Sequence, residues 1–413
     1  MAHDTTDIVI VGAGIMGLSI AYQIVRRTDH YRIKIFEKAP NVGEGSTGAS
    51  SSILRHRYSY PDPIKVARDG HTAYKNWAKY TGLEEPRAEF HHTGVLWMMG
   101  ETRQVVQKFH DLMSGLGVKV SVLDPEGVLE RFPSLSTCGA HFDLSFEEDH
   151  TCEDGEAFLY EEEGAYFDPV SACQDLLEAV RREGVEVRFK SPVVRVRTRG
   201  GRIEGVDLAD DTQIDAPMVV NAAGPWATRL ANMAGLDLGW KLRPIRAQVI
   251  YRESPPELMP IPTVVDRSSG IYFRPENRGQ QILTGSILEK DEQEEVDPDD
   301  FNQNIDRAFR DTKIYGLHHR IPDLPYRGHI TGVSGLYTVN ADDVYPIIGP
   351  TPIEGFVVAN GFSGHGFKEA SSVGSMIAQW LTGKTIEFDT DADMAFFSID
   401  RKPHALAEKS VLA

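Results

Sequence analysis

Residues 8–19, "IVIVGAGIMGLS", decide the fold of this chain. A short apolar run ends at Gly12 and helical apolar spacing follows, so the stretch predicts a strand, a tight turn and a helix. Its glycines have the spacing GxGxxG. Gly12 permits the turn, Gly14 lets a pyrophosphate approach the backbone, and Gly17 lets the helix pack against the strand. The stretch therefore predicts a dinucleotide site.

The following residues complete a βαβ unit. We expect a strand over Asp7–Val11, a helix over Ile15–Arg26 and a second strand over Arg32–Phe36, which together imply a parallel sheet. Glu37 follows the second strand and is placed to accept hydrogen bonds from a ribose, with Lys38 beside it. Ile15 and Met16, the first residues of the helix, are expected next to the phosphates.

Similar signals return later in the chain. A helix followed by a strand is expected in "DPVSACQDLLEAVRREGVEVRF", and buried strands in "APMVVNAAG" and "GFVVANG", whereas the stretches between them alternate polar and apolar residues. We predict an α/β plus antiparallel β fold. Its Rossmann-like nucleotide domain is built from residues 1–87, 166–239 and 336–413. Residues 88–165 and 240–335 form an inserted substrate domain with a mixed or antiparallel sheet.

Composition narrows the class of protein. The chain has 413 residues, 41% of them apolar and 25% charged, as expected for a globular protein of about two domains. A net charge of −18 argues against nucleic-acid binding. Cys138, Cys152 and Cys173 form no CxxC pair, which favours a reducing compartment. A strand pattern from Asp7 and no apolar run of membrane length predict a cytoplasmic protein without a membrane span.

Two segments concentrate acidic residues. Residues 141–165 hold ten carboxylates without Lys or Arg, and residues 289–300 hold eight with one Lys. Both are interpreted as solvated loops, or as a docking surface for a basic electron-transfer partner. His150 and Cys152 lie in the first segment. Two ligands without further His or Cys nearby make a poor metal site, so no metal is expected.

A glycine-rich stretch, "GFSGHGFKEASS" at 361–372, leads into a helix expected to end near Gly383. Its glycines would let a flat ring approach the backbone. Free N–H groups from Gly364 to Phe367 and the helix dipole would stabilise negative charge, while Lys368 would present an ammonium to a substrate carboxylate. The alternative is an ordinary helix start with a surface lysine. The cofactor candidates here are Gly361, Gly364, His365, Gly366, Phe367 and Lys368.

A polar loop, "GEGSTGASSSILRHRYSYP" at 43–61, would pass over the same ring, with Ser46 as a contact. In an extended stretch Arg55 and Arg57 share one face and His56 lies on the other. A solvated basic loop is the alternative interpretation.

Four runs, "VGAGIMGLSIAY", "NAAGPWA", "LRPIRAQ" and "GFSGHGFKEASSVG", resemble the D-amino-acid oxidase superfamily of FAD enzymes over nearly the whole chain. The monomeric sarcosine oxidase branch is the nearest match. The resemblance implies FAD as cofactor, Arg55 and Lys368 as ligands of the substrate carboxylate, and Tyr272 in the substrate site. It also implies cofactor contacts from Val194, Ala223, Gly224 and Trp226.

The chain departs from that branch at two places. Gly335, in "GLYT", stands where sarcosine oxidases carry the cysteine that binds flavin covalently, so a non-covalent FAD is expected. Leu283 stands where those oxidases carry an oxygen-activating lysine, and Ile287 replaces a neighbouring histidine. This favours a dehydrogenase that uses an electron-transfer partner over a fast oxidase that uses O2.

The predicted activity is oxidation of the carbon–nitrogen bond of a small amino acid with an N-methyl or other secondary amine, through an imine that water hydrolyses. Arg274, two residues after Tyr272, would read a second acidic group on the substrate or pair with a surface carboxylate. Three alternatives stay open. They are a D-amino-acid or glycine dehydrogenase, a 2-hydroxy-acid dehydrogenase with His56 as base, and a non-catalytic flavoprotein acting in assembly or electron transfer.

Overall fold

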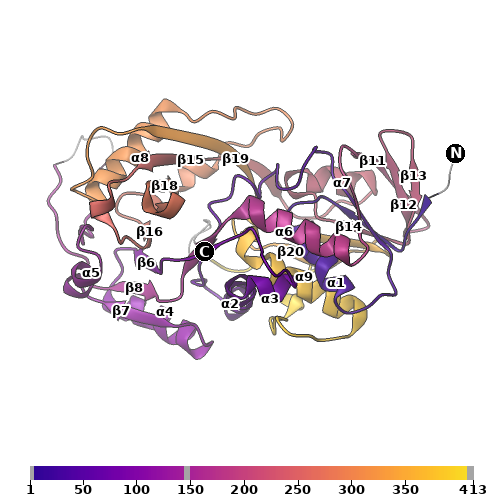
Figure 1. Cartoon of the computed structure of the whole chain (residues 1–413), viewed down its shortest axis with the longest axis horizontal. Helices are drawn as coiled ribbons and strands as arrows, with labels where there is room; N and C mark the ends of the chain where they lie inside the picture. The colour runs from indigo at the N-terminus through magenta and orange to yellow at the C-terminus, as the bar shows by residue number, and fades with distance from the viewer. Residues whose placement is uncertain (1–3, 144–148, 407–413) are drawn as a thin grey trace.

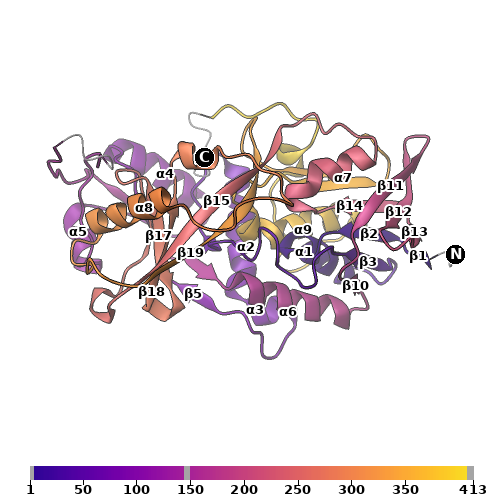
Figure 2. The same ribbon diagram turned by 90° about the horizontal axis from the view of Figure 1, so that it is seen from above.

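The computed structural model describes residues 4–143 and 149–406, which form two large sheets toward opposite ends of an elongated molecule (Figures 1 and 2). One sheet has six strands, in the order β10 (Glu186–Arg188), β3 (Ile33–Phe36), β2 (Ile8–Val11), β14 (Met218–Asn221), β21 (Phe356–Asn360) and β20 (Ile347–Pro350). The first five are parallel and β20 is antiparallel to β21. The βαβ unit predicted from the GxGxxG stretch is therefore present.

Both faces of this sheet are covered. Ile8 and Ile10 of β2 pack into the core on the side of α1 (Ile15–Val25), α6 (Pro169–Arg182) and α9 (Gly366–Thr382). Val9 points to the opposite core, shared with α7 (Ala227–Met233) and a four-stranded sheet. That sheet has the order β1 (Asp4–Thr5), β13 (Gln213–Asp215), β12 (Arg202–Leu208) and β11 (Val193–Arg199). Burial on both faces explains why the central strands are almost wholly apolar.

The other large sheet has eight strands. Their order is β19 (Ile330–Asn340), β15 (Leu242–Glu253), β18 (Gln281–Ser286), β17 (Ile271–Glu276), β16 (Thr263–Asp266), β6 (Val95–Met98), β8 (Phe158–Glu161) and β7 (Val120–Leu123). All neighbours are antiparallel except β16 and β6, so the sheet is mixed, as predicted. This region also contains three helices that the alternating sequence patterns did not predict. They are α4 (Arg103–Gly115), α5 (Pro125–Arg131) and α8 (Arg307–Arg320).

The connections between the two regions are structured. A small sheet joins β4 (Ile53–Leu54), β9 (Ala165–Phe167) and β5 (Phe90–His92), and α2 (Pro61–Lys75) and α3 (Trp77–Thr81) lie between β4 and β5 in the chain. Short 3-10 turns lie at Gly224–Trp226, Pro256–Leu258, Asn277–Gly279, Glu289–Glu292 and Met394–Phe397. The expected domain boundaries near 87 and 165 border or enter the small sheet, and the one at 335 falls inside β19. The two-domain division itself stays a prediction.

Several carboxylates of the second acidic segment, residues 289–300, form ion pairs with lysine and arginine side chains of the protein, so the segment is not simply a solvated loop. Asp299 pairs with Lys38 at 2.5 Å, and Asp297 pairs with Arg229 at 2.7 Å. Asp291 pairs with the buried Lys313 at 2.8 Å. In the first segment, Glu147 and Glu148 lie outside the described residues. Among the helices that are described, none is both long and apolar enough to cross a membrane.

Candidate functional site

The turn between β2 and α1 requires glycine. Gly12 has φ of 108°, and a Cβ there would lie 2.5 Å from the carbonyl oxygen of Ala222. A Cβ on Gly17 would lie 2.0 Å from the carbonyl oxygen of Gly12, so the helix packs directly on the turn. The Ile15 N–H donates to Thr47 Oγ1 at 3.2 Å, whereas those of Met16 and Gly17 have no acceptor within the helix.

Glu37 is held beside this turn. Its Oε2 accepts from the Ala13 N–H and its Oε1 from the Ala39 N–H, both at 2.8 Å. Its carbonyl accepts from the Ser191 N–H at 2.9 Å, which brings the start of β11 alongside. Val194 of β11 is 50% exposed and lies at a register shift, where it pairs with no described residue of β12. Its backbone is thus outside the ladder.

The remaining candidates near β14 fall into two groups. Ala223 and Gly224 follow β14 directly, next to the Ala222 carbonyl that contacts the glycine turn. Lys38 and Trp226 instead engage the acidic segment: Lys38 Nζ lies 3.5 Å from the Trp226 ring centroid, and Trp226 Nε1 donates to Asp299 at 3.0 Å.

Two features of the polar loop suit a bound group. The Ser46 Oγ is buried and has no hydrogen-bond partner within the described chain. Gly335 of β19 faces the loop, and a Cβ there would lie 2.4 Å from the Cβ of Ala49. A cysteine at position 335 would therefore not fit without movement of the loop.

The glycine-rich stretch forms the start of α9. Gly361 and Gly364 have φ of 76° and 83°. A Cβ on Gly364 would lie 3.3 Å from the Tyr337 ring, and one on Gly366 would lie 3.0 Å from Phe362. The helix begins one residue after His365, whose N–H donates to the Phe362 carbonyl at 2.7 Å. The expectation of a free N–H at His365 is therefore wrong, because the turn that precedes the helix uses it.

A cavity brings together residues from four separate elements. Arg55 follows β4, Tyr272 lies on β17, Tyr337 on β19, and Lys368 on α9. The rest of its lining is Ser50, Ser51, Ser52, Ile53, Val265, Gly364 and Phe367. The predicted pair of cations thus lines a single cavity together with the predicted tyrosine.

The two cations lie against the same aromatic ring. The Arg55 guanidinium is 4.7 Å, and Lys368 Nζ is 5.8 Å, from the ring centroid of Tyr58. Lys368 is buried, with its Nζ 3.4 Å from the His365 carbonyl oxygen, so it is not a surface lysine. Burial, together with the charge of Arg55, lowers the pKa of Lys368 to about 7.

A buried carboxylate, that of Glu369, lies next to Lys368 in the chain and contacts the same tyrosine, Tyr58, as the two cations. Glu369 Oε1 accepts from the Tyr58 hydroxyl at 3.1 Å, and its Oε2 has no hydrogen-bond partner in the described part of the chain. Burial raises the pKa of Glu369, although the neighbouring Lys368 opposes that shift. The protonation states of Lys368 and Glu369 therefore depend on each other and on Arg55, because all three are buried close together.

The surroundings of His56 do not support its predicted role as a catalytic base. Its Nδ1 and its backbone N–H both lie 2.7 Å from Glu161 Oε2, and Trp97 Nε1 donates to Oε1 at 2.8 Å. Burial opposes the ionisation of Glu161, but its pKa is lowered by the hydrogen bonds from His56 and Trp97. His56 does not belong to the described lining of the cavity. Its assignment as a base for hydroxy acids is therefore not supported, because a base must reach the bound substrate.

The basic run is not a solvated loop. Arg55, His56 and Arg57 are all buried, and Arg57 pairs with Glu101 at 2.5 Å. The Trp97 ring lies 5.3 Å from the Arg55 guanidinium and 5.0 Å from that of Arg57, so the two arginines share a face, as the alternation predicted.

Arg274 pairs with a carboxylate of the protein, which is the second of the two environments expected for it. It pairs with Glu276 at 2.6 Å, its Nε donates to the Ser51 carbonyl at 2.8 Å, and it stacks on Tyr166. It does not belong to the described cavity lining. A direct contact with substrate is thus disfavoured, because its charge is already matched.

Tyr58, Tyr337 and Glu369 are among the residues of the site that the sequence analysis did not predict. Tyr337 lies two residues after Gly335 on β19 and so shares its face of the strand. Glu369 is an acidic residue in the first turn of an otherwise apolar buried helix. Both signals were visible in the sequence, whereas the place of Tyr58 depends on its contact with α9.

The site fits a flavin dinucleotide. Four features suit it: a glycine turn without room for side chains, helix N–H groups without helical acceptors, an oriented carboxylate, and a buried serine hydroxyl without a hydrogen-bond partner in the described chain. The model of the FAD dependent oxidoreductase family, DAO, matches residues 7–380. The chain belongs to that family, and its cofactor is accordingly FAD.

The relatives cover almost the whole chain. FAD-dependent oxidoreductase domain-containing protein 1 of Bos taurus is 28% identical over 92% of this chain and 81% of its own length. The mitochondrial dimethylglycine dehydrogenase of Rattus norvegicus is 24% identical over 94% of this chain, which spans 44% of that protein.

Two solved structures share the fold. L-proline dehydrogenase from P. horikoshii has a TM-score of 0.79 at 23% identity, covering 96% of this chain and 98% of its own. Glycine oxidase from Geobacillus kaustophilus has a TM-score of 0.78 at 20% identity, covering 97% and 100%. The expected superfamily and fold are confirmed.

Proposed function

We propose that this flavoprotein oxidises the carbon–nitrogen bond of a small amino acid whose nitrogen carries an alkyl group. The observation that carries the proposal is the pairing of two buried cations, Arg55 and Lys368, in one cavity. Two cations from distant segments suit a carboxylate, which can accept charge-assisted hydrogen bonds from both.

The cavity orients its ligand by the carboxylate. Arg55 and Lys368 would hold that end, while Tyr272 and Tyr337 bound the space beyond it. FAD, when bound, supplies the acceptor for two electrons and a hydrogen. Holding the reacting C–H bond in one orientation is the main contribution of these side chains.

The lining favours an amine over an alcohol. Among the described residues that line the cavity none is an imidazole or a carboxylate, and the amine of Lys368 must be protonated to hold the carboxylate, so it is not free to take a hydroxyl proton. An ammonium bound near two cations loses its proton more readily, because like charges disfavour its charged form. The nitrogen lone pair then forms the C=N bond as the C–H bond breaks, and water hydrolyses the imine to an aldehyde and an amine.

The names of two relatives support an alkylated amine. Dimethylglycine dehydrogenase and L-proline dehydrogenase are named for substrates that combine a carboxylate with such a nitrogen. Glycine oxidase is named for a primary amine, and this keeps the primary-amine alternative in the test. Leu283 stands where sarcosine oxidases carry an oxygen-activating lysine, and it is a buried hydrocarbon side chain. Its lack of charge supports a dehydrogenase that passes electrons to a partner.

The test is anaerobic mixing of the FAD-loaded protein with sarcosine, N,N-dimethylglycine, L-proline, glycine, D-alanine and lactate. We expect the flavin absorbance to bleach at least tenfold faster with the alkylated amines, and to recover slowly in air. Fastest bleaching by glycine or D-alanine would move the assignment to a primary amine, and by lactate to a hydroxy acid. No bleaching, with FAD present, would leave a non-catalytic flavoprotein.

A variant pair separates binding from folding. Arg55→Met removes a cation of the cavity, and Arg274→Met removes a buried arginine outside it. Only the first is expected to weaken substrate binding, with both retaining FAD. Equal losses in the two variants would contradict the placement of the carboxylate.

We also propose that FAD is held without a covalent bond, since position 335 has no cysteine and no room for one. Acid precipitation is expected to leave all flavin in the supernatant. Flavin that stays with the precipitate would contradict this. The cytoplasmic location stays a prediction.

A further inference from the structure

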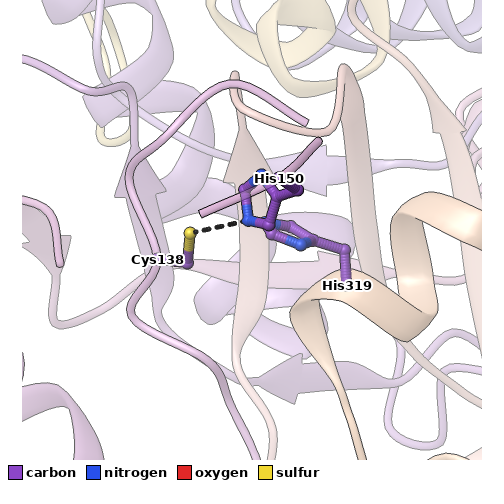
Figure 3. A group of neighbouring side chains, drawn as sticks. All are labelled: Cys138, His150 and His319. Carbon is purple, nitrogen blue, oxygen red and sulfur yellow. Dashed lines mark hydrogen bonds between the residues drawn. The ribbon is translucent and has the colours of Figure 1, made fainter. Parts of the chain in front are cut away.

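A second cluster of reactive side chains lies near the end of α8 in the eight-stranded region, and none of its residues belongs to the described lining of the cavity (Figures 1 and 3). Cys138, His150 and His319 each offer an atom that could bind a metal, and these atoms all lie within 4.8 Å of one another. Cys138 Sγ is 3.4 Å from His150 Nε2. The exclusion of a metal at this loop was wrong in its premise, because α8 brings a further histidine to it.

We propose that Cys138, His150 and His319 bind a zinc ion, with Cys152 as the fourth ligand. Around a tetrahedral zinc with bonds of about 2.0 to 2.3 Å, ligand atoms lie about 3.3 to 3.8 Å apart. The separation of Cys138 and His150 already has that value. The other separations among Cys138, His150 and His319 are at most 4.8 Å, so they need shifts of up to about 1.5 Å, within the reach of side-chain rotation. Mixed thiolate and imidazole ligands are those that zinc prefers.

The two histidines are prepared for this role. His150 Nδ1 lies 3.2 Å from the His141 carbonyl oxygen, an acceptor only, so this nitrogen carries the proton and Nε2 keeps the lone pair. The Nε2 of His319 is buried and has no hydrogen-bond partner in residues 4–143 and 149–406. The Phe142 ring stacks on His319 at 4.4 Å and meets His150 edge-on, which orients both imidazoles.

The backbone around the cluster is fixed. Arg320, the neighbour of His319, is fully buried, pairs with Asp266 at 2.8 Å and donates to the Cys138 carbonyl at 2.9 Å. Gly139 N–H donates to the Glu153 carbonyl at 2.7 Å. One arginine thus links the elements that carry two of the ligands, so the cluster is held together before any ion binds.

Cys152 is the natural fourth ligand. Its thiol is near enough to that of Cys138 for the two to interact, and the residue is exposed, which gives an ion a route from solvent. The bound ion would fasten Cys138, His150 and Cys152 to the end of α8. This role does not depend on the reaction at the flavin.

The experiment uses the full-length FAD-loaded protein, treated with a chelator and then given zinc. We expect one zinc per chain by mass spectrometry of the metal, and alkylation of Cys138 and Cys152 at least tenfold slower with zinc, with Cys173 unchanged as internal reference. Cobalt in place of zinc is expected to give absorption bands to the red of the flavin, as tetrahedral thiolate ligation does. Failure of wild-type protein to retain zinc would overturn the proposal.

Two neighbouring histidines give a matched pair of variants. His319→Gln removes a ligand, whereas His318→Gln removes a ring that stacks on Tyr326 instead. We expect zinc affinity to fall more than a hundredfold in the first and to stay within threefold in the second, with flavin absorbance confirming that both are folded. Equal affinity in the two variants would overturn the proposal, as would a Cys138–Cys152 disulfide in the freshly purified protein.

Discussion

Replacing Lys368 by methionine tests the carboxylate site directly. The lysine is buried and lines the cavity with Arg55, so the variant keeps the volume but removes one charge. A hydrogen bond to a charged group contributes about 1.5 to 3 kcal/mol. The dissociation constant of a carboxylate ligand at pH 7 is therefore expected to rise about ten- to a hundredfold in Lys368→Met, while the FAD content stays near that of the wild type.

The same residue predicts how binding depends on pH. With its pKa lowered to about 7, Lys368 is largely uncharged above that pH and must be protonated before it can pair with a carboxylate. The protonated fraction of Lys368 falls by at most tenfold per pH unit above 7, which corresponds to about 1.4 kcal/mol, so the dissociation constant rises with pH until it approaches that of Lys368→Met, about ten- to a hundredfold above the wild-type value at pH 7. In Lys368→Met this rise is absent, because nothing in its place is protonated.

Methoxyacetate suits the assay, since it has the shape of sarcosine but no amine that would titrate over this range. Its binding is followed through the change in flavin absorbance on titration at half-unit pH steps. Lys313→Met is the matched control, because Lys313 is also buried but pairs with Asp291 outside the cavity. The control is expected to keep both the affinity and the pH profile of the wild type.

Two results would refute this reasoning. If methoxyacetate binds Lys368→Met within threefold of wild type at pH 7, the lysine does not hold the carboxylate. If wild type and variant share one pH profile, the titrating group is another residue and the perturbed state of Lys368 has no part in binding.

Three further changes have definite expected outcomes. In Gly17→Ala the new Cβ meets a backbone carbonyl at 2.0 Å, so the ratio of flavin to protein absorbance should fall severalfold, whereas Gly115→Ala, with open space, should keep it. Gly335→Cys should lose FAD without forming a covalent link, and adding Ala49→Gly should recover loading by relieving the 2.4 Å contact. Glu161→Gln should cost about 2 to 3 kcal/mol in urea unfolding at pH 7. Because the folded pKa of Glu161 is lowered, that difference should shrink as pH falls below about 4.5.

The elements predicted well are those whose signal is local. The β2–α1 turn, and the end of α9 at Gly383 with φ of 66°, depend on residues within a few positions of one another. The pairing of His56 with Glu161 and the approach of His319 to Cys138 were not predicted. Those contacts join residues more than a hundred positions apart, and no periodicity in one sequence reports them.

The domain boundary expected at residue 335 was misplaced because the order of the strands in the sheet could not be predicted. β19 is the long partner of β15 throughout residues 242–252, so the chain leaves the eight-stranded sheet only at Asn340. An alternating pattern indicates a strand but not its neighbour, which is why the boundary expected at 335 falls inside it.

The six-stranded sheet also dictates when the protein can first hold its cofactor during synthesis. β14 pairs with β2 on one side and with β21 on the other, so its second edge stays open until residue 360 has left the ribosome. The helix that covers α1 follows later still, at Gly366–Thr382. A growing chain therefore carries this unpaired edge of β14 while residues 222–360 are made, and an open edge can pair with the wrong strand. We therefore expect flavin to bind only after residues 366–382 have been made, so a chain stalled before that point would have an incomplete sheet and no bound flavin.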